Sequence, residues 1–98
     1  MDKPKHIKIR TVFMGTSNFA ATILESLLEE HYNIVGVYTK PDKPVGRDQK
    51  IEPSAVKDLS IKKELPVFQP SKFNDEAIDE LKKLAPDLII VAAYGKIL

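Results

Sequence analysis

The sequence contains no cysteine, only four glycines and no long hydrophobic run, and each shortage excludes a class of protein. Without cysteine the chain forms no disulfide and offers no thiolate to a metal, a composition that suits the reducing cytoplasm. No apolar run approaches the roughly 20 residues of a membrane span, and no signal-peptide segment follows the N-terminus. We therefore expect a soluble, cytoplasmic protein with no membrane partner.

Net charge and catalytic groups are also scarce. The formal net charge is +1, so only a local cluster of basic residues would attract nucleic acid. The two histidines, His6 near the N-terminus and His31 after the first predicted helix, are both expected to be solvated. No nucleophile–base pair, cluster of metal ligands or phosphate-binding P-loop is recognisable in the sequence. The sequence therefore predicts neither a catalytic residue nor a metal site in this chain.

Apolar, β-branched runs alternate with amphipathic segments, which predicts an α/β fold. Strands are expected at residues 7–14, 33–39, 66–70 and 88–93, and helices starting at Ser17 or Asn18, near Pro53 and after the cap Asn74. Right-handed crossovers then give a doubly wound, Rossmann-like parallel sheet, with predicted strand order 3-2-1-4. Residues 1–6 form a tail and residues 7–98 one domain, in which the continuously apolar last strand is covered on both faces.

The predicted strand order reverses between the first and fourth strands, and open α/β sheets bind ligands at such a point. Residues 15–18 and 94–98 meet there. The turn Gly15-Thr16-Ser17-Asn18 ends a strand and opens a helix, so its backbone amides suit an anion as well as a plain structural turn.

The same turn is a poor dinucleotide fingerprint, because Ser17 and Ala20 stand where the G-x-G-x-x-G pattern has glycine. No acidic residue ends the second strand to bind a ribose hydroxyl, since Thr39 and Lys40 stand there instead. Lys40 or Arg47 could still contact the additional phosphate of NADP. An NADP-binding oxidoreductase domain therefore remains an alternative.

A basic loop, residues 39–50, follows the second predicted strand. It holds two prolines, one glycine and four basic residues, and it is longer than the roughly 2–6 residues that usually join a strand to a helix. Because it lacks apolar anchors, we predict poor order and early trypsin cleavage at Arg47 or Lys50. A ligand-binding loop and a solvated insertion are both consistent with this composition.

Five segments in register resemble the N-terminal part of the methionyl-tRNA formyltransferase family. They are VFMGTSNFA at residues 12–20, TKPDKPVGR at 39–47, PSAVK at 53–57, LPVFQP at 65–70 and PDLIIVAAYG at 86–95. Members of this family transfer a formyl group from 10-formyltetrahydrofolate to the amino group of methionine on initiator tRNA. The resemblance implies a truncated formyltransferase domain, whose catalytic residues are expected downstream of Leu98.

The resemblance also implies three groups of site residues. Lys40, Lys43, Gly46, Arg47 and Lys50 are expected to contact tRNA, with Arg47 the strongest candidate because a guanidinium binds phosphate bidentately. Backbone groups of Tyr94, Gly95, Lys96, Ile97 and Leu98 are expected to line the folate pocket. Gly15, Thr16, Ser17 and Asn18 are expected to face the formyl acceptor.

Related activities stay open as alternatives, namely another 10-formyltetrahydrofolate-dependent formyltransferase or hydrolase, or a pure binding module. The full-length enzyme is expected to be a monomer without a metal cofactor. The chain alone is expected to be inactive, and to self-associate through its last strand, which loses the neighbour on its far edge.

Overall fold

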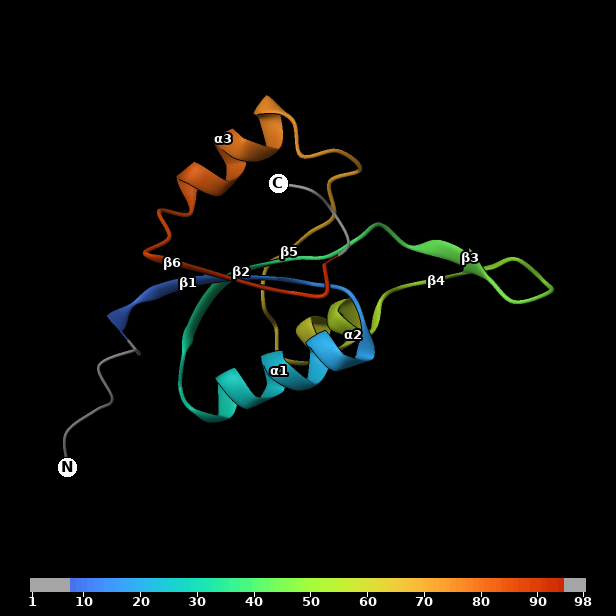
Figure 1. Cartoon of the computed structure of the whole chain (residues 1–98), viewed down its shortest axis with the longest axis horizontal. Helices are drawn as coiled ribbons and strands as arrows, with labels where there is room; N and C mark the ends of the chain where they lie inside the picture. The colour runs from blue at the N-terminus through green and yellow to red at the C-terminus, as the bar shows by residue number, and fades with distance from the viewer. Residues whose placement is uncertain (1–7, 95–98) are drawn as a thin grey trace.

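The computed structural model describes residues 8–94, which form a four-stranded parallel sheet between two layers of helices (Figure 1). The strands of this sheet are β1 (Arg10–Gly15), β2 (Asn33–Tyr38), β5 (Val67–Phe68) and β6 (Leu88–Ala92), in the spatial order β5-β2-β1-β6. These are the third, second, first and fourth strands expected from the sequence. The predicted order 3-2-1-4 and the doubly wound α/β class are therefore confirmed.

Each helix begins at a polar residue whose side chain accepts a hydrogen bond from the backbone N–H three residues later. The helices are α1 (Asn18–Glu29), α2 (Ala55–Lys62) and α3 (Asp75–Lys83), and their caps are Ser17, Ser54 and Asn74. Sequence reasoning allowed either Ser17 or Asn18 as the first cap, and the structure selects Ser17. The helix expected to start near Pro53 is confirmed, with Pro53 directly before the cap Ser54.

Two apolar clusters hold the helices on opposite faces of the sheet. Helices α1 and α2 pack on one face, where Ala20, Leu24 and Val56 meet Phe13 and Val37. Helix α3 covers the other face through partly buried residues that pack on a cluster around β1 and β2. The residues of that second cluster are Val12, Met14, Tyr38 and Tyr94. This two-sided packing fixes the carboxyl ends of β1 and β2 at one rim of the sheet.

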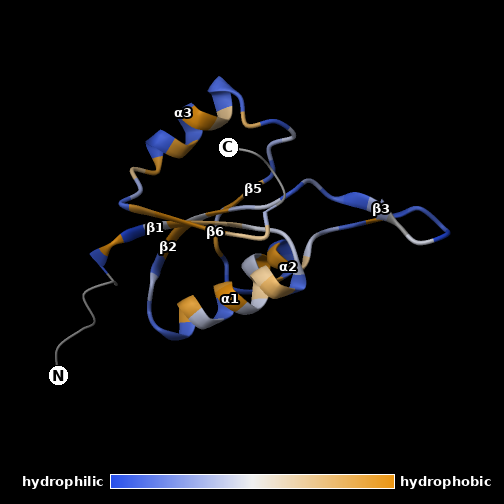
Figure 2. Ribbon diagram, viewed as in Figure 1, coloured by the Kyte–Doolittle hydropathy of each residue, from blue (hydrophilic) through white to orange (hydrophobic). Residues whose placement is uncertain are grey.

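Residues 43–52 contain a β-hairpin that the sequence did not predict. Strands β3 (Lys43–Val45) and β4 (Lys50–Glu52) pair antiparallel and extend away from the sheet (Figure 1). The loop expected here is therefore a hairpin, whereas its poor order and early trypsin cleavage stay predictions. Gly46 has a φ of +71° and Gln49 a φ of +52°, so left-handed backbone at both positions closes the turn between the two strands. Figure 2 shows that this hairpin is mostly hydrophilic.

Strand β6 lies at the edge of the sheet and is not covered on both faces, contrary to the expectation from its apolar sequence. Leu88, Ile89 and Val91 are exposed, and Val91 retains half of its accessible surface. Phe19, which belongs to the apolar face of α1, is 68% exposed. Within residues 8–94 no further element covers this side of the domain, so these apolar side chains remain in contact with solvent.

Candidate functional site

A pocket of about 400 Å³ lies at the carboxyl rim of the sheet, at the ends of β1 and β2 and next to the reversal of strand order between β1 and β6. It is lined by residues 16–18 of the β1–α1 turn, by Lys40, Pro41 and Lys43, and by residues 52–54 before α2. The structure therefore unites the turn expected to face the acceptor with two of the five residues expected to bind tRNA. A second cavity of about 420 Å³, between the segment after β5 and α3, contains none of the predicted site residues.

The electrostatic character of the pocket favours an anion. The N-termini of α1 and α2 both lie at its wall, because the caps Ser17 and Ser54 line it. Each helix N-terminus carries a partial positive charge and backbone N–H groups without intrahelical acceptors. Lys40 and Lys43 add two cations, whereas Glu52 is the only acidic side chain among the described lining residues. Phosphate or carboxylate groups are the ligands that such an arrangement binds.

The β1–α1 turn also has a structural role. A Cβ atom added at Gly15 would lie 2.7 Å from the Cβ of Ala20 and 2.8 Å from the carbonyl oxygen of Ala92. Only glycine therefore lets β1, α1 and β6 approach this closely. The Thr16 hydroxyl donates to the carbonyl of Tyr94 at 3.0 Å and lies 3.4 Å from the backbone nitrogen of Lys40, which joins three segments of the rim.

The hairpin and its two connections, residues 40–52, form an arm that begins at the pocket and extends beyond it. Lys40 and Lys43 lie at the pocket, whereas Arg47 lies in the exposed turn between β3 and β4. In the turn, the Gln49 side chain donates to the carbonyl of Gly46 at 2.9 Å. The five residues expected to contact tRNA are thus distributed along one projecting element, and their contacts with RNA remain a prediction.

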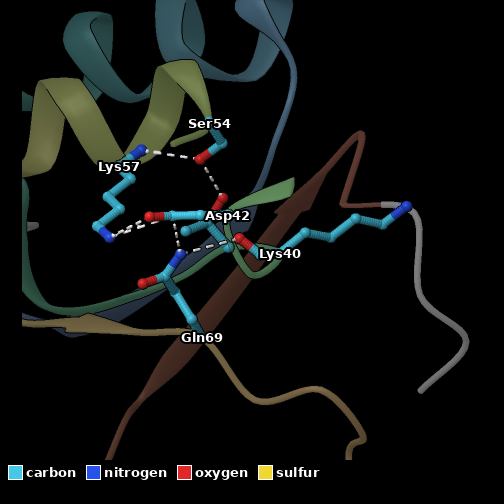
Figure 3. Close-up of polar contacts among 6 residues, drawn as sticks. Lys40, Asp42, Ser54, Lys57 and Gln69 are labelled. Atoms are coloured by element: carbon cyan, nitrogen blue, oxygen red, sulfur yellow. Dashed lines mark hydrogen bonds and ion pairs between the residues drawn. The ribbon is translucent and has the colours of Figure 1, made fainter. Parts of the chain in front are cut away.

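At the base of the arm, Asp42 accepts hydrogen bonds from two side chains (Figure 3). The Lys57 ammonium lies 3.0 and 3.1 Å from the two carboxylate oxygens, and the Gln69 amide donates to one of them at 2.8 Å. The hydrogen bond from Gln69, followed by that from Lys57, lowers the pKa of Asp42. Asp42 is therefore a bound carboxylate and a poor general base. Sequence reasoning identified neither Lys57 nor Gln69, because their spacing from Asp42 gives no local signal.

The segment expected to contact folate is only partly described, since Gly95, Lys96, Ile97 and Leu98 lie outside residues 8–94. Tyr94 is 1% exposed, and its hydroxyl is buried without a hydrogen-bond partner. Burial raises the pKa of Tyr94. Burial, with a further effect of the Glu80 carboxylate, also raises the pKa of the neighbouring Tyr38. The aromatic ring of Tyr94 thus belongs to the core, and the folate assignment for its backbone stays a prediction.

Few other catalytic or metal-binding groups are found in the part of the chain that the structure describes. His31 lies exposed just after α1, away from the pocket, and His6 is outside the described residues. Between residues 8 and 94, no three His, Asp or Glu side chains are grouped to hold a metal ion. The described helices are all too short and polar to cross a membrane.

A family model described as formyl transferase matches residues 7–98. The chain belongs to the formyl transferase family. Three similar curated proteins are named methionyl-tRNA formyltransferase: those of a Sulfurihydrogenibium species, 49% identical over 92 residues, a Nitratiruptor species, 54% over 93, and Pseudomonas putida (strain W619), 54% over 91. Each alignment covers 92% of this chain but only 29–30% of the relative. The chain thus spans less than a third of the length of the curated relatives it matches.

Proposed function

We propose that residues 7–98 form the N-terminal part of a methionyl-tRNA formyltransferase domain and that this part binds the acceptor end of the tRNA. The observation that carries the proposal is the identity of about 50% to proteins of that name along almost the whole chain. The family match favours formyl transfer over the NADP-binding alternative. The close packing around Gly15 supports this choice, because it accounts for that glycine without a dinucleotide.

The arm and the pocket supply complementary parts of an RNA-binding surface. Lys43, Arg47 and Lys50 are exposed cations of the arm and Lys40 is half-buried at its base, and such cations bind phosphates of the RNA backbone. The pocket of about 400 Å³ falls in the size range of small-molecule sites and offers two helix N-termini. We place the charged acceptor stem along the arm and one phosphate group near its end in the pocket.

The chemical step requires groups that the described residues do not offer. In formyl transfer the methionine amine attacks the formyl carbon of 10-formyltetrahydrofolate. The bond from that carbon to N10 then breaks, and a proton passes from the amine to N10. The reaction needs an oxyanion stabiliser and a positioned base. Asp42 is held by Lys57 and Gln69, and no histidine lines the pocket among residues 8–94. We therefore assign substrate binding, not catalysis, to this chain.

The donor side of the reaction is assigned to residues 94–98, whose backbone we propose contacts the pterin of 10-formyltetrahydrofolate. A pterin presents donors and acceptors along one edge, which backbone N–H and C=O groups match. The position of Tyr94 at the rim, bonded through its carbonyl to Thr16, supports a location next to the acceptor pocket. The initiator tRNA and the folate would then meet at the strand-order reversal.

Chemical-shift mapping of the isotopically labelled chain tests this proposal. A methionylated acceptor-stem hairpin should shift backbone signals of residues 16–18, Lys40, Lys43 and Arg47, tetrahydrofolate should shift those near Tyr94, and NADPH should shift neither group. The variant Lys62→Ala, which loses one exposed lysine at the far end of α2, should keep the RNA-induced shifts of the parent and serves as the control. Shifts at residues 15–18 with NADPH, or none in the arm with RNA, would contradict the proposal.

A further inference from the structure

Five described residues other than glycine have left-handed backbone, and ordinary chain reversals account for four of them. His31, Glu64 and Ala85 each directly follow the C-cap of a helix, where a left-handed residue commonly ends the helix. Gln49 lies in the turn between β3 and β4. Ala93, with a φ of +49°, directly follows strand β6 and belongs to neither class. Such a residue is strained, and strained residues concentrate at functional sites.

The left-handed residue reverses the alternation of side chains along β6. Residues two apart on a strand point to the same face of a sheet. Ile90 and Ala92 follow this rule, because both pack on the cluster below α1 and α2. Tyr94 would be the next residue on that face, yet its ring lies in the cluster on the opposite face, under α3, and is 1% exposed. The turn at Ala93 therefore ends the strand and places the Tyr94 ring in the other half of the core.

Thr16 holds this turn with two hydrogen bonds. The backbone N–H of Thr16 donates to the carbonyl of Ala93 at 3.2 Å, and its hydroxyl donates to the carbonyl of Tyr94 at 3.0 Å. One residue of the β1–α1 turn thus binds two successive carbonyl groups after β6. The parallel register between β1 and β6, which ends with Gly15 opposite Ala92, brings the two segments together. Thr16 is half-buried, so its bonds are partly shielded from water.

We propose that Ala93, Thr16 and the ring of Tyr94 form a latch that fixes the backbone leaving β6 beside the pocket. Thr16 also lines the pocket, so the latch sets the distance between the acceptor side and the donor side of the rim. This deepens, and rests on, the proposed contact of the backbone after β6 with a pterin. Backbone that is fixed before binding loses less conformational freedom when the ligand arrives, so it binds more tightly. Ala93 and Thr16 are positioning residues in this account.

Two alanines form a matched pair for testing the latch. Ala93 and Ala85 are both exposed and both have a φ of +49°, so a β-branched valine is strained at either position. Only Ala93 belongs to the latch, since Ala85 follows the end of α3. Isothermal titration calorimetry should show that Ala93→Val weakens tetrahydrofolate binding roughly 10-fold, and Ala85→Val less than about 2-fold. Ala93→Gly should bind as the parent does, because glycine adopts a positive φ without strain. Equal losses in the two valine variants would overturn the latch.

A second pair of variants tests the hydroxyl of Thr16. Thr16→Val keeps the shape of the side chain but removes the bond to Tyr94, and it should weaken tetrahydrofolate binding roughly 3- to 10-fold. Thr16→Ser restores a hydroxyl and should recover most of this loss. Thr22→Val is the control, because the Thr22 hydroxyl also donates to a carbonyl, that of Asn18 at 3.1 Å, but lies within α1. Parent-like binding by Thr16→Val would contradict the latch.

The latch can also be measured without folate. Hydrogen exchange of the Thr16 amide reports its bond to the Ala93 carbonyl, and Ala93→Val should speed this exchange roughly 10-fold or more. Ala85→Val should leave it unchanged. Equal exchange at residue 16 in the parent and Ala93→Val would refute the latch even if tetrahydrofolate binds as proposed. Faster exchange in Ala93→Val, with no tetrahydrofolate binding by the parent, would refute the proposed donor site and leave the latch standing as a feature of the fold.

Discussion

The arm and strand β6 both lie at the surface of the domain, one rich in charge and the other free of it. The arm is polar along its length, and side-chain hydrogen bonds at its base connect it to the domain. β6 is bound to β1 by backbone pairing and exposes Leu88, Ile89 and Val91. Contact with water is favourable for the charged side chains of the arm and unfavourable for the exposed apolar side chains of β6. The arm is therefore a complete surface suited to a charged ligand, whereas β6 is a surface that a further chain segment would cover.

The largest expected effect concerns the reaction itself. If binding surfaces are all that this chain supplies, it should produce no formylmethionine from 10-formyltetrahydrofolate and methionylated initiator tRNA. Loss of a general base or of an oxyanion donor costs about 10²–10³-fold or more each, which puts the rate at background. An acid-urea gel measures the product. Turnover above the no-protein control would show that a catalytic group lies among residues that we assign to binding.

A charge placed on β6 should change the association state. The exposed apolar edge is expected to pair with a second copy of the chain, and Val91→Lys should prevent this because a lysine blocks edge pairing. Sedimentation velocity should show at least a roughly 10-fold weaker self-association. Ile61→Lys is the control, since Ile61 is 59% exposed but belongs to helix α2 and not to a strand. A monomeric parent, or equal effects of both variants, would remove the proposed contrast between the edge and other exposed apolar residues.

The variant Arg47→Ala tests the arm, the charged region of the comparison. One bidentate contact of an arginine with a phosphate or base is worth about 1–3 kcal/mol, so binding of the acceptor stem should weaken roughly 10-fold. Tetrahydrofolate binding should be unchanged, because Arg47 lies in the turn of the arm. Lys62→Ala serves as the control. Equal RNA affinity of the parent and Arg47→Ala would show that the arm is a solvated insertion that does not bind RNA.

The smallest expected effect is the response of the arm to acid. Hydrogen bonds from Gln69 and Lys57 lower the pKa of Asp42 below its ordinary value of 3.8. A carboxyl with a depressed pKa in the folded state contributes stability above its unfolded pKa, and the contribution is lost as the pH falls through the folded pKa. The backbone amide shifts of residues 40–42 should stay constant from about pH 7 to 5 and change only below about pH 4. A change of these shifts while the pH is still above 5 would mean that another titrating group acts on the base of the arm.

The sequence predicted the sheet well because its signals there are local. Alternating apolar and amphipathic segments gave the strand order, and Asn74 and the pair Ser17 or Asn18 gave helix caps within one residue. The hairpin was missed because its three-residue strands carry Pro44 and three charged residues, which resemble a loop. The full coverage expected for β6 was wrong. An apolar sequence indicates that a strand is suited to burial, but it does not show whether a neighbouring strand or helix is present to cover it.

The site was predictable only in part. The rim was identified from topology, and the pocket does combine the β1–α1 turn with Lys40 and Lys43. The polar cluster at the base of the arm was not foreseen, since Asp42, Lys57 and Gln69 are far apart in the sequence and meet only when α2 and the segment after β5 pack beside β2. Such long-range polar clusters leave no periodic signal, unlike helices and strands.

The salt dependence of RNA binding tests the central claim, that the arm and the pocket together bind the anionic acceptor end. The triple variant Lys40→Ala, Lys43→Ala and Arg47→Ala removes three proposed phosphate contacts. The slope of log K against log salt concentration should fall in magnitude by roughly 2–3 relative to the parent, because each lost contact removes close to one released counterion. The variant Lys62→Ala should keep the parent slope. Equal slopes for the triple variant and the parent would contradict the account.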